Sequence, residues 1–234
     1  HYLFRDFNDR MVHLELHYDF EINLETLKTV LICFFEKAPV LHSRFVDNKV
    51  SPYWEIMPYR IEDVITVKHS DNVTEDIDRF LTQYIPPESS LQMKVGVFYY
   101  EGKTALCMVE NHMCMDGGDF KYFIRSFCKA YSEYEEQGIS PINLREGTRS
   151  YDSVYTDFSK TQEKMARNLY RNVCAKDTHK FPLTESREDD HSFIARRKIS
   201  EETFLKLKTV GKSYGATVND MLVAAYFYSL YALA

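Results

Sequence analysis

A histidine, an aspartate and two glycines stand close together in the stretch ENHMCMDGG. His112 follows an apolar run, and Asp116 lies four residues later, directly before Gly117 and Gly118. Histidine can remove a proton near neutral pH because its pKa lies close to the working pH. A nearby acid can hold the imidazole or brace the loop, and glycines let the backbone turn tightly beside a substrate. These residues are compatible with an acyl-transfer site in which His112 is the general base.

An ordinary strand-to-helix loop, with Asp119 as the helix cap, explains the same stretch. A histidine followed after three residues by Asp-Gly can arise by chance, and Asp-Gly is a common turn. Cys114 is a further candidate nucleophile, with His112 as its base. A reactive thiol needs a lowered pKa, for which the sequence offers no argument, and buried structural cysteines are common. From these residues alone, both the catalytic and the structural interpretation stay open.

Polar and apolar residues alternate from Val12 to Phe20, which predicts a strand with one buried face. His13, Glu15 and His17 share the other face at a spacing that could hold a metal. No fourth ligand is indicated, so we expect a solvated or partner-facing polar face and no metal site.

Two amphipathic helices are predicted upstream of the motif. Apolar residues recur every three or four positions over 24–38, with Asn23 as the cap and Pro39 as the stop. The second helix is predicted over 74–85, and Pro86 is expected to end it.

Strands are predicted between and after these helices. A strand over 40–47 would place His42 and Arg44, which lie two residues apart, on the same side. The segments 91–100 and 104–112 flank the turn signal EGK and predict a hairpin. The motif histidine would leave from the end of the second strand of that hairpin.

An aromatic-striped helix is predicted to start near Asp119 and to end at Gly138, with its stripe in the core. Residues 138–192 are the least organised part of the chain, and a strand is predicted over 193–200. This part of the sequence therefore separates the motif from the last two predicted helices.

Two helices are predicted at the C-terminal end. Ser200 opens a helix that runs to Gly215, and Thr217 with Asp220 forms a capping-box-like start for 218–234. The last helix is apolar on all sides but shorter than the roughly 20 residues of a membrane span, so we predict a buried helix. Because the chain supplies no second layer to bury it, either the chain is a fragment or another copy supplies that layer, and we expect a fragment.

The composition limits the classes of partner and compartment. The chain of 234 residues has a formal net charge of −6 and no basic stripe, which argues against a nucleic-acid partner. Five cysteines without a CxxC pair predict reduced thiols and a cytoplasmic location. The chain opens with His1 rather than Met, so we expect that its true start is missing.

The order of predicted elements, with APVLHSRF, NHMCMDGG and GATVNDMLVAAY at their places, resembles the chloramphenicol acetyltransferase-like acyltransferases. That superfamily includes condensation domains of non-ribosomal peptide synthetases and alcohol acetyltransferases, and the resemblance spans essentially the whole chain. It implies an α+β fold, a two-layer sandwich of a mixed sheet backed by helices, as one half of a pseudo-dimeric two-subdomain architecture. Residues 1–180 would form the N-terminal subdomain, and 181–234 the crossover and first elements of an incomplete C-terminal subdomain.

The family motif His-His-x3-Asp-Gly falls on NHMCMDG in this chain. The resemblance implies that His112 is the general base and that Asp116 is a structural, ion-paired residue. It places Gly117 at the mouth of the substrate channel, which Asn111 and Gly118 are also expected to line. Asn111 occupies the position of the family's first motif histidine.

A second family motif differs from the usual one. His42 stands where the family usually has an arginine, and Arg44, predicted on the same side of its strand, could replace that arginine as the partner of Asp116. If neither residue pairs with Asp116, the loop is less firmly set.

The resemblance implies an acyltransferase that moves an acyl group from coenzyme A or a carrier-protein thioester to a hydroxyl or amine. Its partners would be this thioester donor, a small-molecule acyl acceptor and the missing C-terminal half of the same chain, with no permanently bound cofactor. We expect a stand-alone enzyme, and a fragment that is inactive alone and self-associates through its last helix. The alternative is a non-catalytic domain retained for binding or assembly, which Asn111 and His42 keep open; a hydrolase lacks an oriented nucleophile.

Overall fold

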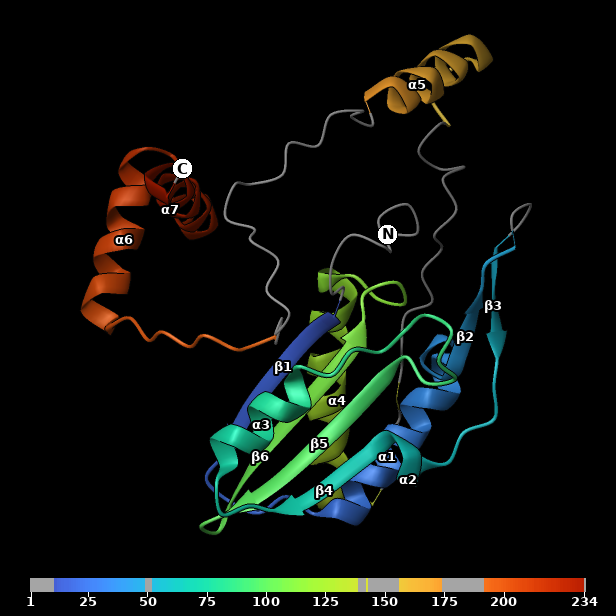
Figure 1. The fold of residues 1–234 in the computed structure, drawn as a ribbon, viewed down its shortest axis with the longest axis vertical. Helices are drawn as coiled ribbons and strands as arrows, with labels where there is room; N and C mark the ends of the chain where they lie inside the picture. The colour runs from blue at the N-terminus through green and yellow to red at the C-terminus, as the bar shows by residue number, and fades with distance from the viewer. Residues whose placement is uncertain (1–10, 49–51, 139–141, 143–155, 174–191, 234) are drawn as a thin grey trace. The chain divides into compact units, whose positions relative to one another are not determined.

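The chain divides into two compact units in the computed structural model, which describes residues 11–48, 52–138, 142, 156–173 and 192–233 (Figure 1). The first unit contains the sheet, the helices up to Gly138 and the short segment Ser192–Ile194. The second unit contains the three helices that follow residue 155.

A four-stranded mixed sheet forms the centre of the first unit, in the order β1-β6-β5-β4. Its strands are β1 (Met11–Tyr18), β4 (Ile65–His69), β5 (Met93–Tyr100) and β6 (Lys103–Asn111). β6 pairs antiparallel with both β1 and β5, whereas the parallel strand β4, which we did not predict, pairs with β5. The predicted first strand and the predicted hairpin are confirmed.

The hairpin between β5 and β6 turns on Glu101 and Gly102. Both residues have a positive φ, of 49° and 71°, as a tight two-residue hairpin turn requires. Glycine adopts this conformation without steric cost, so Gly102 explains why EGK is a turn signal.

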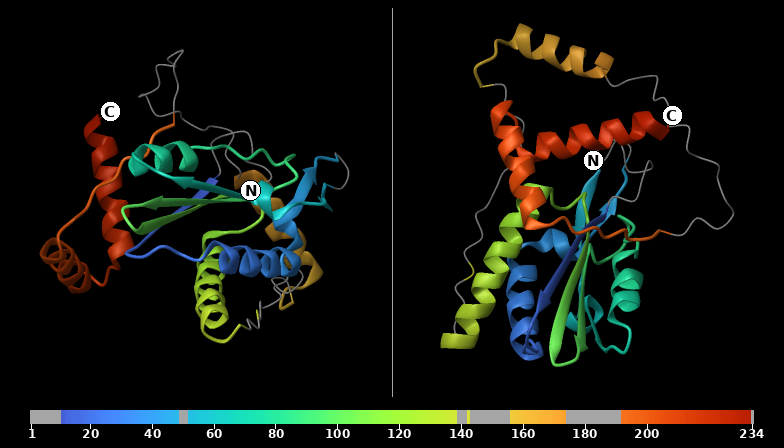
Figure 2. Two further views of the ribbon diagram at one scale, coloured as in Figure 1. Left: turned by 90° about the horizontal axis from the view of Figure 1, so that it is seen from below. Right: turned by 90° about the vertical axis from the view of Figure 1, so that its left-hand side faces the viewer.

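Helices cover both faces of the sheet (Figure 2). α1 (Leu24–Lys37) and α4 (Gly117–Gln137) lie on one face, and α3 (Val73–Leu81) lies on the other. α1 forms where predicted because the Asn23 side chain caps it, accepting hydrogen bonds from the backbone N–H groups of the first turn at 3.0 and 3.3 Å. The α+β class and the mixed sheet backed by helices are therefore confirmed.

The main core lies between the sheet and the pair α1 and α4. Phe34 of α1 is fully buried, and its ring centroid lies 5.0 Å from that of Phe123 and 6.0 Å from that of Phe127, both on α4. A smaller core lies under α3, where the rings of Phe80 and Phe98 are 5.8 Å apart. These contacts join α4, and with it the motif, to the body of the sheet.

The segment predicted as one strand over 40–47 has a different structure. Pro39–His42 is a 3-10 helix, and only the following residues form β2 (Ser43–Val46), which pairs antiparallel with β3 (Tyr53–Ile56) in a separate small sheet. The Ser43 hydroxyl donates to the Pro39 carbonyl at 2.7 Å and closes the helical turn. His42 therefore lies outside the strand. The prediction that His42 and Arg44 lie on the same side of one strand was wrong.

Other predicted boundaries also move. α3 ends at Leu81, well before Pro86, and Thr82 follows as its C-cap, donating to the Asp78 carbonyl from both its hydroxyl and its N–H. The strand predicted over 193–200 was wrong, since these residues are irregular and carry consecutive cations in place of an apolar face. Besides β4, two further short elements were not predicted, namely α2 (Ile61–Val64) and β3.

The second unit contains α5 (Lys160–Val173), α6 (Glu201–Ser213) and α7 (Val218–Leu233). α5 falls within the stretch that we expected to be unorganised, whereas α6 and α7 begin where predicted. The Ser200 hydroxyl accepts from the Thr203 N–H at 3.2 Å. Within the described residues, the chain has no helix with the length and apolar character that crossing a membrane demands.

Helix α7 keeps most of its large apolar side chains exposed. Tyr226 and Phe227 are 62% and 63% exposed, and Tyr231 is 83% exposed. α7 approaches α6 at Gly211, where an added Cβ would lie 3.3 Å from the Met221 side chain and 3.1 Å from the Ala216 carbonyl oxygen. This contact covers only a small part of an all-round apolar helix.

Candidate active site

His112 leaves the sheet at the end of β6, as predicted. β6 ends at Asn111, residues 112–114 form a turn, and α4 begins at Gly117. His112 is half-buried, and its Nδ1 atom is shielded from solvent.

Asn111 fixes the backbone at the exit of β6. Its side chain is 1% exposed, donates from Nδ2 to the Ile85 carbonyl at 2.9 Å and accepts at Oδ1 from the Met113 N–H at 2.9 Å. Its backbone N–H donates to the Gln92 carbonyl at 2.9 Å, and its carbonyl accepts from the Cys114 N–H at 3.0 Å. These four bonds hold the two peptide units on either side of His112. We expected Asn111 to line the channel, and the structure directs its amide to the backbone.

Cys114 and Glu110 lie buried directly beside this turn. The Cys114 thiol donates to Glu110 Oε1 at 3.2 Å and lies 2.9 Å from the Asn111 carbonyl oxygen. Cys114 is 3% exposed and Glu110 is fully buried. The thiol therefore faces the protein interior, which disfavours the interpretation of Cys114 as a nucleophile.

Asp116 is the N-cap of α4. Its Oδ1 accepts from the Gly118 N–H at 2.7 Å and from the Asp119 N–H at 2.9 Å. The alternative in which Asp119 caps the helix was wrong, because the helix begins two residues earlier than that acid. A carboxylate at this position also interacts favourably with the positive end of the helix dipole.

The two glycines after Asp116 meet different surroundings. A Cβ added to Gly117 would have no other atom within 4 Å, so space is open beside this residue. A Cβ added to Gly118 would lie 3.1 Å from Asp116 Oδ1, the atom that accepts the helix-capping bonds. Gly118 thus accommodates the cap, and Gly117 leaves room next to the turn.

His42 and Arg44 make their polar contacts around β3. His42 donates from Nδ1 to the Met57 carbonyl at 2.6 Å, and its ring lies 4.7 Å from that of Tyr59. Arg44 pairs with Glu55 at 2.5 Å across β2 and β3. We predicted that Arg44 could take the place of the family's arginine as the partner of Asp116. In the structure, Arg44 pairs with Glu55 instead.

Backbone hydrogen bonds connect the His42 region to the motif. The Leu41 carbonyl accepts from the Gln92 N–H at 2.8 Å, and the Gln92 carbonyl accepts from the Asn111 N–H. The Gln92 side chain is fully buried and donates to the carbonyls of Pro87 and Ser89 at 3.1 and 2.7 Å. Gln92 therefore braces the 3-10 helix, the 85–91 loop and the end of β6.

Glu110 and Gln92 were not predicted as site residues. Glu110 follows Leu106 and Met108 at two-residue spacing on β6, so the strand alternation already predicts that its side chain points to the apolar face of those residues. No comparable signal exists for Gln92, whose role depends on contacts with three separate segments. No group of His, Cys, Asp and Glu side chains in the described part of the chain is arranged to hold a metal ion.

Solved domains of peptide synthetases share the fold of this chain. The first condensation domain of the CDA synthetase matches with a TM-score of 0.66 at 15% identity, over 95% of this chain and 56% of that one. The epimerization domain from the third module of tyrocidine synthetase B matches with a TM-score of 0.62 at 15% identity, over 93% of this chain and 51% of that one. The chain thus spans about half the length of these solved structures, and at such identities they show the shared fold.

The search of curated protein sequences found no match. The family model of the condensation domain, by contrast, matches residues 8–234, almost the whole chain. The chain therefore belongs to the condensation domain family, within the superfamily of chloramphenicol acetyltransferase-like acyltransferases.

Proposed function

We propose that this chain carries the histidine-bearing half of an acyl-transfer site in which His112 is the general base. Membership of the condensation domain family supports transfer from a carrier-protein thioester to an amine, with no permanently bound cofactor. Acyl-coenzyme A contains the same thioester carbonyl, so it is the alternative donor. A hydroxyl group is the alternative acceptor in place of the amine.

In this reaction the acceptor nitrogen attacks the thioester carbonyl carbon. A carbon–nitrogen bond forms, the carbon–sulfur bond breaks, and the thiolate leaves. The imidazole of His112 takes the proton from the nitrogen and returns it to the departing sulfur, so the histidine ends in its starting state. Because Nδ1 is shielded, we assign the proton transfer to Nε2.

The observation that carries this proposal is the way in which Asn111 holds the exit of β6. A general base must be held in a productive geometry by neighbours that are themselves locked. Asn111 bonds to the backbone on both sides of His112 and to the loop at Ile85. The histidine thus projects from the end of a central strand whose exit these hydrogen bonds hold in place.

The remaining predicted residues would act on the site through the backbone. We propose that Asp116 positions the turn as the cap of α4, and that Gly118 leaves room for this cap. His42 would support the turn through the backbone bonds of Leu41 and Gln92. Arg44 pairs with Glu55 across β2 and β3, which supports a role for its side chain in holding these two strands together.

The central test is the turnover of His112→Ala in a protein that contains both halves of the condensation fold. Loss of a general base is expected to lower turnover by roughly 10²–10⁴-fold. Single-turnover amide formation from an acyl-carrier thioester measures this effect, and acyl-coenzyme A with alcohols tests the alternative substrates. His13→Ala is the matched control because His13 is an exposed histidine on β1.

Two outcomes would overturn the assignment. Wild-type turnover in His112→Ala would remove the histidine from the chemistry. A wild-type protein that binds the acylated carrier but forms no product above the uncatalysed rate would favour a non-catalytic domain retained for binding.

The role of Asp116 is tested by comparing two substitutions. Asparagine is as good an N-cap as aspartate, whereas alanine costs about 0.5–2 kcal/mol of stability. Asp116→Asn should therefore keep both stability and turnover, and Asp116→Ala should lose stability in urea unfolding. If Asp116→Asn is as damaging as the alanine variant, the charge of Asp116 is required and an ion pair replaces the cap as the explanation.

A further inference from the structure

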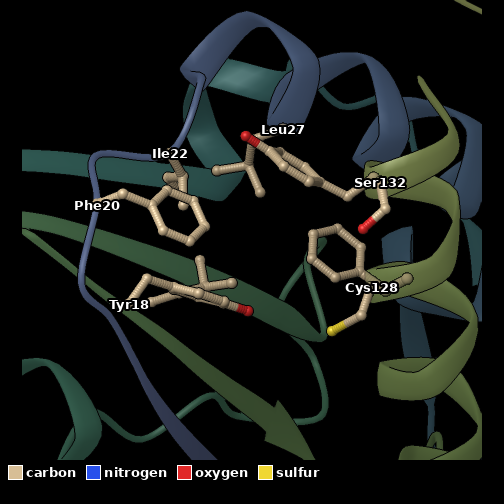
Figure 3. A pocket seen from close by; sticks show the side chains of 9 residues that line it. Tyr18, Phe20, Ile22, Leu27, Cys128 and Ser132 are labelled. Carbon is tan, nitrogen blue, oxygen red and sulfur yellow. The ribbon is translucent and has the colours of Figure 1, made fainter. Parts of the chain in front are cut away.

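A cavity of about 150 Å³ lies among side chains of β1, β6, α1 and α4. Figure 3 shows this cavity from close by. Its lining includes Tyr18 at the end of β1 and Leu106 near the start of β6. Leu106 and His112 are six residues apart, so the two places are separated by about 20 Å along an extended strand. The cavity is therefore separate from the proposed active site.

Four aromatic rings and three aliphatic side chains form the wall of the cavity. The rings belong to Tyr18, Phe20, Phe127 and Tyr131. Phe20 is 55% exposed, so one part of this wall lies at the surface and gives access from solvent. Apolar cavities of about this volume in other proteins stay dry and bind single-ring molecules such as benzene.

Polar atoms lie on one side of the cavity. Cys128 and Ser132 lie one turn apart on α4, and Figure 3 shows the Cys128 sulfur and the Tyr18 hydroxyl pointing toward one another. Burial and the neighbouring Cys128 thiol raise the pKa of Tyr18 to about 12, so its hydroxyl keeps its proton. The Tyr131 hydroxyl accepts from the Asn23 N–H at 2.7 Å, which fixes its position.

We propose that this cavity is a binding site for a single-ring aromatic alcohol. The ring would pack edge-to-face among the four aromatic side chains, a geometry that the electrostatics of aromatic rings favour. The ligand hydroxyl would bond to Tyr18 or Ser132, the groups that give the site a polar end. An aliphatic ligand of the same size would gain only the apolar contacts.

Alkylation of Cys128 by iodoacetamide tests this proposal on the 234-residue chain, with p-cresol as the probe. A ligand at ten times its Kd occupies about 90% of the sites, so saturating p-cresol should slow labelling of Cys128 about tenfold. Peptide mass spectrometry follows each cysteine separately. Cys33 is the internal control, because it is also partly exposed but does not line the cavity.

Ligand analogues and two variants at Ser132 complete the test. Toluene and cyclohexanol should protect Cys128 less than p-cresol at equal concentration. Ser132→Leu places a larger side chain at the cavity and should abolish protection, whereas Ser132→Ala should keep the ring contacts and still respond to toluene. Circular dichroism confirms that both variants fold.

The wild-type measurement alone decides the proposal if a variant does not fold. Absence of protection at Cys128 up to the solubility limit of p-cresol would overturn it. Equal slowing at Cys128 and Cys33 would also overturn it, because that result indicates a general solvent effect. Better protection by cyclohexanol than by p-cresol would reject the aromatic class.

Discussion

The sheet unit and the helix pair α6–α7 differ in how far they bury their aromatic side chains. In the sheet unit, Phe34 and Phe35 of α1 are completely buried between the sheet and α4. In α7, Phe227 is 63% exposed and Tyr228 is 81% exposed. Both helices are rich in apolar residues, but α1 has an amphipathic pattern that one layer can cover, and α7 is apolar around its circumference.

The difference indicates that the supporting layers, rather than the helix sequence alone, determine burial. An amphipathic helix needs one neighbouring surface, whereas a helix that is apolar all round needs several. α6 touches α7 through the small surface around Gly211 and Met221. Exposed apolar patches of this kind typically mark surfaces that another element or molecule covers.

The largest expected effect comes from a matched pair of phenylalanine truncations. Phe34→Ala removes a fully buried ring that contacts Phe123 and Phe127, and it should cost about 3–5 kcal/mol of unfolding free energy. Phe227→Ala should change the same quantity by less than about 0.5 kcal/mol because its ring is mostly exposed. Urea unfolding followed by circular dichroism measures both, and equal costs would contradict the comparison.

A smaller effect is expected from overpacking the core under α3. At Gly96 an added Cβ would lie 2.7 Å from the Phe98 ring and 3.1 Å from the Phe80 ring. Gly96→Val should therefore cost about 1–3 kcal/mol of unfolding free energy. Gly117→Val provides a control for glycine replacement, since a Cβ there meets no atom within 4 Å. A Gly96 variant as stable as wild type would mean that this second core repacks freely.

A still smaller, pH-dependent effect is expected at Tyr18, which is only half-buried. Its pKa is about 12 in the folded chain against 10.0 as the ordinary value, because burial and then the Cys128 thiol disfavour the phenolate. The unfolded state loses its proton first, so this stabilisation is present below pH 10 and is lost as the pH rises toward about 12. Stability measured from pH 9 to 12 should fall less steeply in Tyr18→Phe, and identical slopes would exclude the effect.

Polar substitution on α7 should have the smallest effect on stability. It should nevertheless clearly reduce the self-association of the chain. Replacing Tyr226, Phe227 and Tyr231 together by serine removes exposed apolar surface without opening a buried core. Light scattering should show that the wild-type chain self-associates and that the variant does so less. If the wild-type chain is monomeric at high concentration, the exposed face of α7 does not mediate self-association.

Local patterns predicted those parts of the fold whose contacts are close in sequence. The cap at Asn23, the hairpin around Gly102 and the capping pair Thr217 and Asp220 need only a few neighbouring residues, and all three are present. β4 could not be predicted because its pairing with β5 spans a helix and a loop. The 3-10 helix at Pro39–His42 replaced a predicted strand because Pro39 favours a helical start as readily as it stops a preceding helix.

The site was predictable in its position and less so in its supporting contacts. The strand-to-turn exit of His112 followed from the hairpin, but the cap of α4 did not. Asp116 and Asp119 both stand at plausible cap positions with two glycines between them, so the sequence alone does not distinguish them. The bonds of Asn111 to Ile85 and Gln92 connect segments that are distant in sequence, and only the folded chain reveals them.

The pairing of β1 with β6 has a consequence for synthesis. Met11 faces Asn111, so the first strand cannot reach its partner until a hundred further residues have been translated. At roughly 5–20 residues per second, this wait lasts roughly 5–20 s. During that time β1 presents unpaired backbone groups to any other extended chain nearby. Until β6 has left the ribosome, β1 therefore stays open to pairing with a strand of another molecule.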